Sequence, residues 1–213
     1  MANAYGSAPC GHLSIFLGPM YSGKTSKLIE VCNNYTKTGT RVLVINYAND
    51  NRYTDKPSLV SHDKISVPCI LVSKLSDVFC MNEASEKIES NNDNSNNDNI
   101  INHNMNRFMI AEVIIINECQ FFPDIVEWVK MAVNTYNKRV YIGGLDGDFE
   151  RKPFGNWLDL VLFCDSITKL SSNCGLCKIS NAIFSHRLTK EKEQIVIGNN
   201  YIPLCRQCYD ILN

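Results

Sequence analysis

An α/β fold with a parallel sheet, followed by a small metal-binding module, is the architecture that the sequence predicts. Apolar runs typical of buried strands alternate with segments of helical periodicity, as in parallel α/β proteins. A glycine loop, Gly18–Thr25, joins the first strand to the first helix. Two Cys-x-x-Cys pairs, Cys174–Cys177 and Cys205–Cys208, lie near the C-terminus. We therefore expect a nucleotide-binding domain over residues 1–170 and a metal-binding domain over residues 171–213.

The first half of the chain contains three predicted strands and two predicted helices. The strands are short apolar runs at residues 14–17, 41–47 and 65–72. The helices have apolar residues at helical spacing, between the glycine loop and Gly39 and more weakly over 73–87. Pro68 lies inside the third run. It favours an edge position for that strand, because proline cannot donate a hydrogen bond to a neighbouring strand.

An asparagine-rich segment interrupts this pattern. Nine of the sixteen residues at 91–106 are Asn. Such a stretch buries too little apolar surface to offset its ordering entropy, so we predict a disordered surface insertion over about 88–107. A partner-binding tract is the alternative interpretation.

The second half returns to the α/β pattern. The predicted strands are at residues 113–116, 140–142 and 166–170. A helix is predicted over about 124–136, where Ile125, Trp128, Val129 and Ala132 share one face.

Composition argues against several classes of protein. The 213 residues include 21 Lys plus Arg and 22 Asp plus Glu, so the net charge is -1. No basic excess is present to hold a nucleic acid by counterion release, and we expect no nucleic-acid partner. No apolar run reaches the roughly 18 residues that span a bilayer, and the N-terminus has no signal-peptide pattern. We expect a cytoplasmic protein with no membrane partner.

The glycine loop fits the Walker A pattern G-x-x-x-x-G-K-[ST]. Gly18 and Gly23 let backbone N–H groups close around phosphates, Lys24 supplies a positive charge, and Thr25 offers a hydroxyl to Mg²⁺. A chance glycine turn before a helix is the alternative, but the strand before the loop and the helix after it favour nucleotide binding. The pattern leaves open whether the protein is an ATPase motor, a GTPase or a small-molecule kinase.

The strand at 113–116 ends in Asn117-Glu118. A second strand of this kind often ends in an acid near the γ-phosphate, and Glu118 could take a proton from an attacking hydroxyl or water there. A solvated charge at the strand end is the alternative.

The four paired cysteines have the spacing of two zinc knuckles. Brought together, Cys174, Cys177, Cys205 and Cys208 would form a tetrahedral, structural Zn²⁺ site. A redox Cys-x-x-Cys is the rival interpretation, although it would need only one pair. The other six cysteines (10, 32, 69, 80, 119 and 164) show no ligand spacing and are interpreted as small core residues or incidental thiols.

Taken together, these motifs resemble the type II thymidine kinases, the zinc-containing family of cellular and poxviral enzymes. The resemblance runs from about Leu13 to Tyr209, apart from the asparagine-rich insertion, and is carried by Gly18–Thr25, Glu118–Asp124, Leu145–Gly155 and the four cysteines. It implies a P-loop NTPase core with a RecA-like sheet and a zinc-bound lasso domain. It also implies transfer of the γ-phosphate of ATP, with Mg²⁺, to the 5′-hydroxyl of thymidine, feedback inhibition by thymidine triphosphate, and a homotetramer.

The resemblance also implies roles for individual residues. The catalytic residues would be Glu118 as general base, with Arg52 and Lys24. The ATP site would comprise Gly18, Pro19, Met20, Tyr21, Ser22, Gly23, Lys24, Thr25, Asp50, Asn51, Arg52, Asn117, Glu118, Cys119 and Gln120. The nucleoside site would comprise Phe121, Leu145, Phe149, Phe154, Ser185, Gln194, Ile195, Val196, Ile197, Gly198 and Tyr201. For Phe121 and Phe154, core packing is the alternative.

Two departures from the family pattern stand beside the proposed base. Asn117 replaces the usual Asp, which predicts weaker Mg²⁺ binding, and Cys119 replaces Gly, which restricts the backbone if φ is positive there. The lasso also differs in length before Ser185 and Tyr201. Two other functions stay open: a thymidine- or dTTP-binding paralogue with weakened catalysis, and a zinc-ribbon P-loop ATPase stimulated by nucleic acid.

Overall fold

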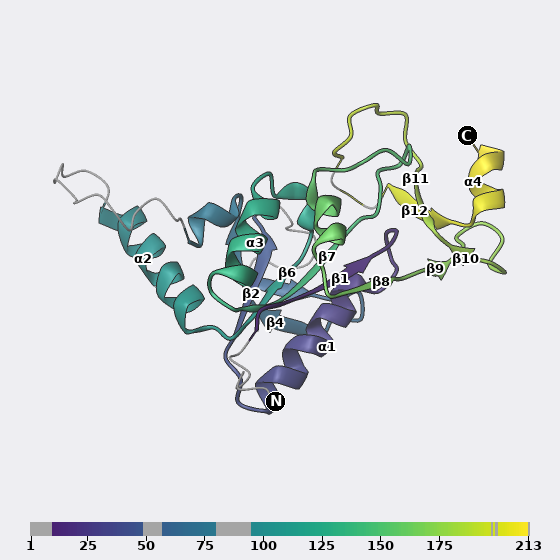
Figure 1. The fold of residues 1–213 in the computed structure, drawn as a ribbon. Coiled ribbons are helices and arrows are strands. Elements are labelled where there is room, and N and C mark those ends of the chain that lie inside the picture. The colour runs from purple at the N-terminus through teal and green to yellow at the C-terminus, as the bar shows by residue number, and fades with distance from the viewer. Residues whose placement is uncertain (1–9, 49–56, 80–94, 197, 199, 213) are drawn as a thin grey trace.

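The computed structural model describes residues 10–48, 57–79, 95–196, 198 and 200–212. A six-stranded, all-parallel sheet forms its centre, in the order β5-β2-β6-β7-β1-β8 (Figure 1). The strands are β1 (His12–Leu17), β2 (Val42–Tyr47), β5 (Ile70–Val72), β6 (Val113–Ile116), β7 (Arg139–Gly144) and β8 (Ser166–Lys169). The predicted α/β fold with a parallel sheet is confirmed.

Both faces of this sheet are covered. Helix α1 (Lys24–Lys37) and the hairpin of β3 (Ser58–Val60) and β4 (Ser66–Pro68) pack on one face, where Val113 and Ile115 point. Helix α3 (Ile125–Asn134) and the 3₁₀ segments η1 (Leu75–Asp77) and η4 (Trp157–Leu162) pack on the other, where Ile114 and Ile116 point. Because β6 is buried on both faces, its sequence is an uninterrupted apolar run.

Two predictions for residues 65–87 needed correction. The strand expected over 65–72 is two strands, because β4 turns back to pair antiparallel with β3 while β5 joins the main sheet. The edge position is confirmed for β5, but Pro68 belongs to the β3–β4 hairpin. Of the weak helix expected over 73–87, the described residues form only the single 3₁₀ turn η1, and residues 80–87 lie outside the described part.

The prediction of disorder was wrong for the second part of the asparagine-rich segment. Residues Ser95–Ile110 form helix α2, which projects from one end of the molecule (Figure 1). Phe108, which directly follows the predicted insertion, anchors the helix. This ring is fully buried, stacks on Phe79 at 4.5 Å and meets Trp128 edge-on at 5.4 Å. Lys138 also donates from Nζ to the carbonyls of Met109 (2.9 Å) and Ala111 (2.7 Å), at the end of the helix.

Removing the Phe108 ring should therefore destabilise the protein strongly. We expect Phe108→Ala to lower the free energy of unfolding by roughly 3–5 kcal/mol, since a fully buried ring leaves a cavity. Met109→Ala is the matched control, because Met109 is adjacent and 48% exposed. Urea unfolding measures both variants. A Phe108→Ala variant as stable as Met109→Ala would show that α2 does not need this anchor.

The C-terminal part is a small module beside the end of the sheet (Figure 1). It comprises β9 (Ser172–Asn173), β10 (Asn181–Ala182), β11 (Phe184–Arg187), β12 (Tyr201–Leu204) and helix α4 (Arg206–Leu212). The strands form two antiparallel pairs, β9 with β10 and β11 with β12. In the part of the chain that the structure describes, no helix is long and apolar enough to cross a membrane.

Candidate active site

The glycine loop turns sharply between β1 and α1. Gly18 has φ +154° and approaches Leu170 so closely that a Cβ would lie 2.4 Å from the Leu170 carbonyl oxygen. Gly23 has φ +84°, a left-handed conformation, immediately before α1. The side chain of Lys24 lies across the loop, and its Nζ donates to the carbonyls of Gly18 (3.0 Å) and Pro19 (2.7 Å). The loop therefore encloses a nearly buried ammonium group at the start of a helix.

The end of β6 lies directly beside this loop. Thr25 Oγ1 donates to Asn117 Oδ1 at 3.4 Å, and Asn117 Nδ2 donates to Asn46 Oδ1 at 3.0 Å. Thr25 and Asn117 thus offer two neutral oxygen atoms where a Mg²⁺ ion with bound water could be held. The chemistry of this oxygen pair fits the ion, although it supplies no negative charge.

Glu118 follows in a left-handed conformation, with φ 55° and ψ 45°. Its carboxylate is oriented by Gln120, whose Nε2 donates to Glu118 Oε2 at 2.6 Å. The other end of the same amide is also fixed, because Leu145 N donates to Gln120 Oε1 at 3.0 Å. A buried glutamine therefore connects the Glu118 carboxylate to the backbone after β7.

A cavity of about 540 Å³ opens at the carboxyl ends of the strands. The glycine loop and a group of aromatic side chains both line it. Phe121 stacks on Tyr47 at 4.9 Å and meets Phe154 edge-on at 5.4 Å. Glu118 lines the same cavity. The same cavity is thus lined by the glycine loop, a carboxylate and the apolar group of Tyr47, Phe121 and Phe154, which we call the aromatic pocket.

The C-terminal module contacts this cavity through β11 and the covering loop, residues 188–200, which joins β11 to β12. Ser185 Oγ on β11 accepts a hydrogen bond from Met20 N of the glycine loop at 2.9 Å. Gln194 of the covering loop donates from Nε2 to Asp148 Oδ2 (2.7 Å) and to the Pro153 carbonyl (3.1 Å). Hydrogen bonds therefore connect the module both to the glycine loop and to the segment after β7.

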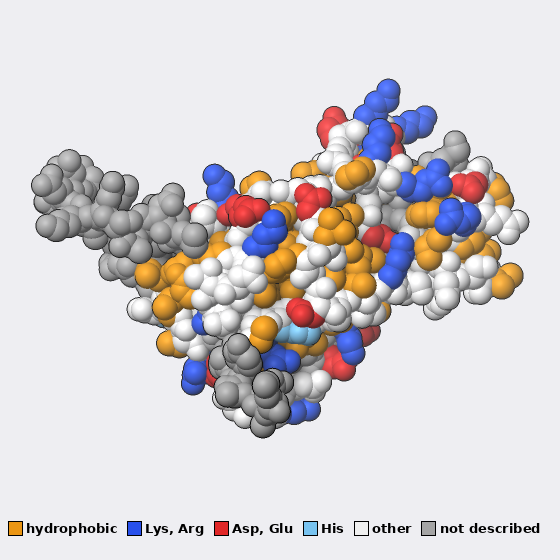
Figure 2. Space-filling model, viewed as in Figure 1, with side chains coloured by type: hydrophobic (Ala, Val, Ile, Leu, Met, Phe, Trp, Pro, Cys, Tyr) orange, Lys and Arg blue, Asp and Glu red, His pale blue; other side chains and the backbone are white. Residues whose placement is uncertain are grey.

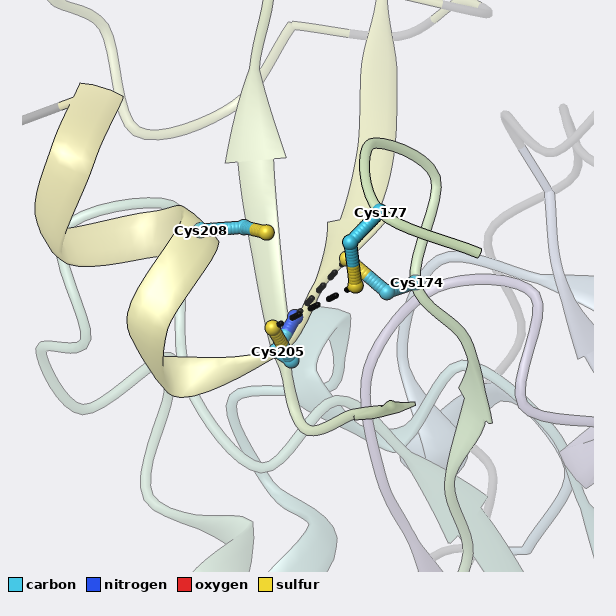
Figure 3. A group of neighbouring side chains, drawn as sticks. All are labelled: Cys174, Cys177, Cys205 and Cys208. Atoms are coloured by element: carbon cyan, nitrogen blue, oxygen red, sulfur yellow. Dashed lines mark hydrogen bonds between the residues drawn. The ribbon is translucent and has the colours of Figure 1, made fainter. Parts of the chain in front are cut away.

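The four paired cysteines converge from separate segments (Figure 3). Their sulfur atoms all lie within 4.8 Å of one another, and the Sγ atoms of Cys177 and Cys205 are 3.9 Å apart. A tetrahedral zinc site with Zn–S bonds of about 2.3 Å needs sulfur separations of about 3.8 Å, whereas a disulfide bond is only about 2.05 Å long. Burial alone would raise the pKa of Cys174, but backbone N–H groups, that of Cys205 foremost, lower it to about 6, whereas burial and the neighbouring cysteines raise the pKa of Cys208 to about 12. The sulfur separations of the quartet are those that fit Zn²⁺ bound by four thiolates.

Comparison with known proteins decides the family. The family model described as thymidine kinase matches residues 11–209. The chain belongs to the thymidine kinase family. Thymidine kinases of poxviruses are among its relatives. That of Yaba monkey tumor virus is 38% identical over 205 residues, which cover 95% of this chain and 97% of the relative. Those of vaccinia virus strain Western Reserve and variola virus are 37% and 36% identical, each covering 93% of this chain and 97% of the relative.

Most of the residues to which sequence analysis assigned a role in the thymidine kinase site line this cavity. From the ATP group these are Met20, Tyr21, Ser22, Gly23, Lys24, Thr25, Asn117, Glu118 and Gln120. From the nucleoside group they are Phe121, Leu145, Phe149, Phe154, Ser185, Gln194, Ile195, Val196, Gly198 and Tyr201. Asp50, Asn51, Arg52 and Ile197 lie outside the described residues.

Three residues of the ATP group, Gly18, Pro19 and Cys119, do not line the cavity. Cys119 points into the core instead, is fully buried, and donates from Sγ to the Ile116 carbonyl at 3.5 Å. Burial raises the pKa of this thiol well above its ordinary value. Positive φ falls on Glu118 and not on Cys119. The replacement of Gly by Cys at this position therefore creates no left-handed strain.

Sequence reasoning missed six residues that line the cavity: Ser26, Tyr47, Val60, His62, Asp63 and Asp148. A usable signal existed for Tyr47, because it ends an apolar strand, and ligands bind at the carboxyl ends of parallel strands. Asp148 lies within the Leu145–Gly155 motif that carried the resemblance. No comparable signal marked His62 and Asp63, which reach the cavity only because the β3–β4 hairpin folds back beside α1.

Proposed function

We propose that the protein transfers the γ-phosphate of ATP to the 5′-hydroxyl of thymidine, giving thymidine monophosphate. The observation that carries this proposal is that the glycine loop, the aromatic pocket of Tyr47, Phe121 and Phe154, and Glu118 all line one cavity. Two substrates bound in these regions would meet near Glu118. Membership of the thymidine kinase family and the names of the poxviral relatives support the same assignment.

The glycine loop would bind the ATP phosphates. Its backbone N–H groups and the start of α1 supply positive partial charge, and Lys24 Nζ would exchange its carbonyl partners for phosphate oxygens. Thr25 and Asn117 would hold Mg²⁺, which when bound neutralises phosphate charge. Arg52, which lies outside the described residues, would stabilise the charge spread over the transferred group.

Glu118 would accept the proton of the 5′-hydroxyl as that oxygen attacks the γ-phosphorus. Gln120 Nε2 donates to Glu118 Oε2 and so orients the carboxylate that would accept the proton. The aromatic pocket would orient the nucleoside so that its 5′-hydroxyl lies beside this carboxylate. Positioning of this kind is the larger part of phosphoryl-transfer catalysis, because the transition state needs little covalent help.

The four cysteines would bind structural Zn²⁺ at the base of the C-terminal module, because four thiolates leave no ligand position open. We also propose a homotetramer, feedback inhibition by thymidine triphosphate and a cytoplasmic location, which rest on the resemblance to type II thymidine kinases.

An ADP-release assay and a measurement of thymidine binding test the proposal against its two rivals. ADP release from ATP is measured with thymidine, deoxycytidine, single-stranded DNA or no addition. Thymidine-dependent release is the expected result. Release that depends on DNA and not on thymidine would indicate a nucleic-acid-stimulated ATPase. Thymidine binding without release would indicate the catalytically weakened paralogue, which the neutral Asn117 favours.

Restoring the missing charge beside the metal should strengthen Mg²⁺ binding. We expect Asn117→Asp to lower the Mg²⁺ concentration for half-maximal activity by roughly five- to tenfold, because a carboxylate about 5 Å from a divalent ion gains about 1–2 kcal/mol even in water. Asn46 can still pair with the introduced carboxylate by turning its amide, since Asn117 now donates to its Oδ1. Asn34→Asp on the exposed face of α1 controls for the added charge. Equal half-saturation of Asn117→Asp and wild type would contradict the expectation.

A further inference from the structure

The covering loop, of which residues 188–196, 198 and 200 are described, forms part of the cavity wall together with the residues assigned to the nucleoside. Gln194, Ile195, Val196 and Gly198 line the cavity, but none of the loop's described residues belongs to a helix or strand. Its charged side chains face solvent, and Figure 2 shows Lys and Arg side chains over this part of the molecule. The shape of this wall must therefore come from contacts on the inner side of the loop.

Those contacts converge on Arg187, the last residue of β11, which is only 4% exposed. Nη1 donates to the carbonyls of Glu191 (2.8 Å) and Glu193 (2.6 Å). Nη2 donates to the Gln194 carbonyl (3.0 Å) and to Tyr201 Oη (2.7 Å), and Nε donates to the same hydroxyl (3.1 Å). A guanidinium group has five N–H donors, and each has an acceptor here.

Tyr201 extends this arrangement by one more bond. Its hydroxyl accepts from Arg187 and donates to the Val196 carbonyl at 3.1 Å. Four loop carbonyls, those of residues 191, 193, 194 and 196, are thus held by one arginine and the tyrosine it contacts. In a segment without regular secondary structure, these bonds satisfy backbone groups that would otherwise have to find water.

The face of the guanidinium group has a separate role. It lies over the ring of Phe149, with Cζ 3.7 Å from the ring centroid. Phe149 lines the cavity, whereas Arg187 does not. The arginine therefore joins the covering loop to the cavity wall formed by the segment after β7, without reaching the bound molecules itself. Its acceptors are neutral oxygens, so carbonyl and hydroxyl dipoles and the aromatic ring face the buried charge.

We propose that Arg187 is a positioning residue that holds the covering loop in its closed shape and thereby sets the affinity for the nucleoside. The inference rests on the proposed function, because the affected ligand is the nucleoside of that reaction. Without Arg187 the loop would sample open shapes. The apparent affinity for the nucleoside would then equal the affinity of the closed form multiplied by the fraction of molecules that remain closed. The hydrogen bonds that orient Lys24 and Glu118 come from other residues, so both groups should keep their geometry.

Steady-state kinetics give the first test. We expect Arg187→Gln to raise KM for thymidine by about tenfold or more, with KM for ATP and kcat changed less than about threefold. Arg187→Lys should fail to rescue, because lysine has three donors and no planar face for Phe149. Tyr201→Phe, which keeps the ring, should give a smaller increase. Arg41→Gln, an exposed arginine just before β2, is the control. Unchanged KM for thymidine, or equal rises for both substrates, would overturn the proposal.

Proteolysis of the free protein gives a test that does not depend on turnover. A glutamate-specific protease can cleave the covering loop at Glu191 and Glu193, which are exposed. Arg187→Gln should be cleaved there about tenfold faster than wild type, with the zinc content of both proteins equal. Equal cleavage rates, or faster cleavage only with loss of zinc, would overturn the proposal. If wild type were cleaved more slowly than Arg187→Gln but showed no thymidine-dependent ADP release, the proposed function would fail while the role of Arg187 in the loop would stand.

Discussion

Glu118→Gln is expected to lower kcat for thymidine phosphorylation by about 10²- to 10⁴-fold, the usual contribution of a positioned general base. The substitution preserves size and leaves an amide oxygen that can still accept the bond from Gln120 Nε2, 2.6 Å from Oε2 in wild type. The left-handed backbone of residue 118 is equally tolerable for Gln and Glu, since both side chains have the same Cβ. The loss should therefore come from proton acceptance and not from folding.

The same assay separates this role from a role in binding. KM for thymidine and ATP should change little, because the glycine loop and the aromatic pocket remain intact. Glu127→Gln on the exposed face of α3 controls for the loss of one negative charge. If Glu118→Gln kept kcat within about threefold of wild type, another group would have to accept the proton.

The parts of the fold that sequence could predict are those whose determinants are local. The strand β6 is four apolar residues bounded by polar ones, and its predicted and observed ranges coincide. The glycine loop needs a left-handed backbone just before α1, and Gly23 adopts it with φ +84°. The spacing of the four cysteines predicts a metal site, and their sulfur atoms do lie within 4.8 Å of one another. In each case a short stretch contains the physical reason for the structure.

The parts that sequence could not predict depend on partners far along the chain. Helix α2 is polar over most of its length, and its anchor Phe108 is buried by Phe79 and Trp128, which local composition cannot reveal. Nothing in the sequence distinguishes Arg187 from a surface arginine, because its hydrogen-bond partners come from the covering loop that folds around it. His62 reaches the cavity from the turn of the β3–β4 hairpin, where the sequence predicts only a strand over residues 65–72. Long-range packing overrides local pattern in all three cases.

Loss of one of the proposed zinc ligands should have the second largest effect on activity. We expect Cys177→Ser to lower bound zinc well below one ion per chain and to reduce kcat/KM for thymidine by at least about 100-fold, since metal binding and folding of a small module are coupled. Cys177 is the suitable position because it is the least buried of the four, so little packing is lost. Cys164→Ser is the control, a partly exposed cysteine outside the quartet.

The reason for so large an effect is the connection between the quartet and the cavity. Cys205 directly follows β12, and β12 pairs with β11, which ends in Arg187 and carries the Ser185 hydroxyl that binds Met20 N. If the quartet binds Zn²⁺ as proposed, removal of the ion would take the central cross-link from the small core around Cys174, Leu204 and Tyr209 and would release both ends of the covering loop together. Atomic absorption measures the zinc content of Cys177→Ser. In this variant ATP should still protect the glycine loop against proteolysis, because that loop lies outside the C-terminal module. A zinc-free Cys177→Ser variant with normal KM for thymidine would show that the covering loop is held without the metal.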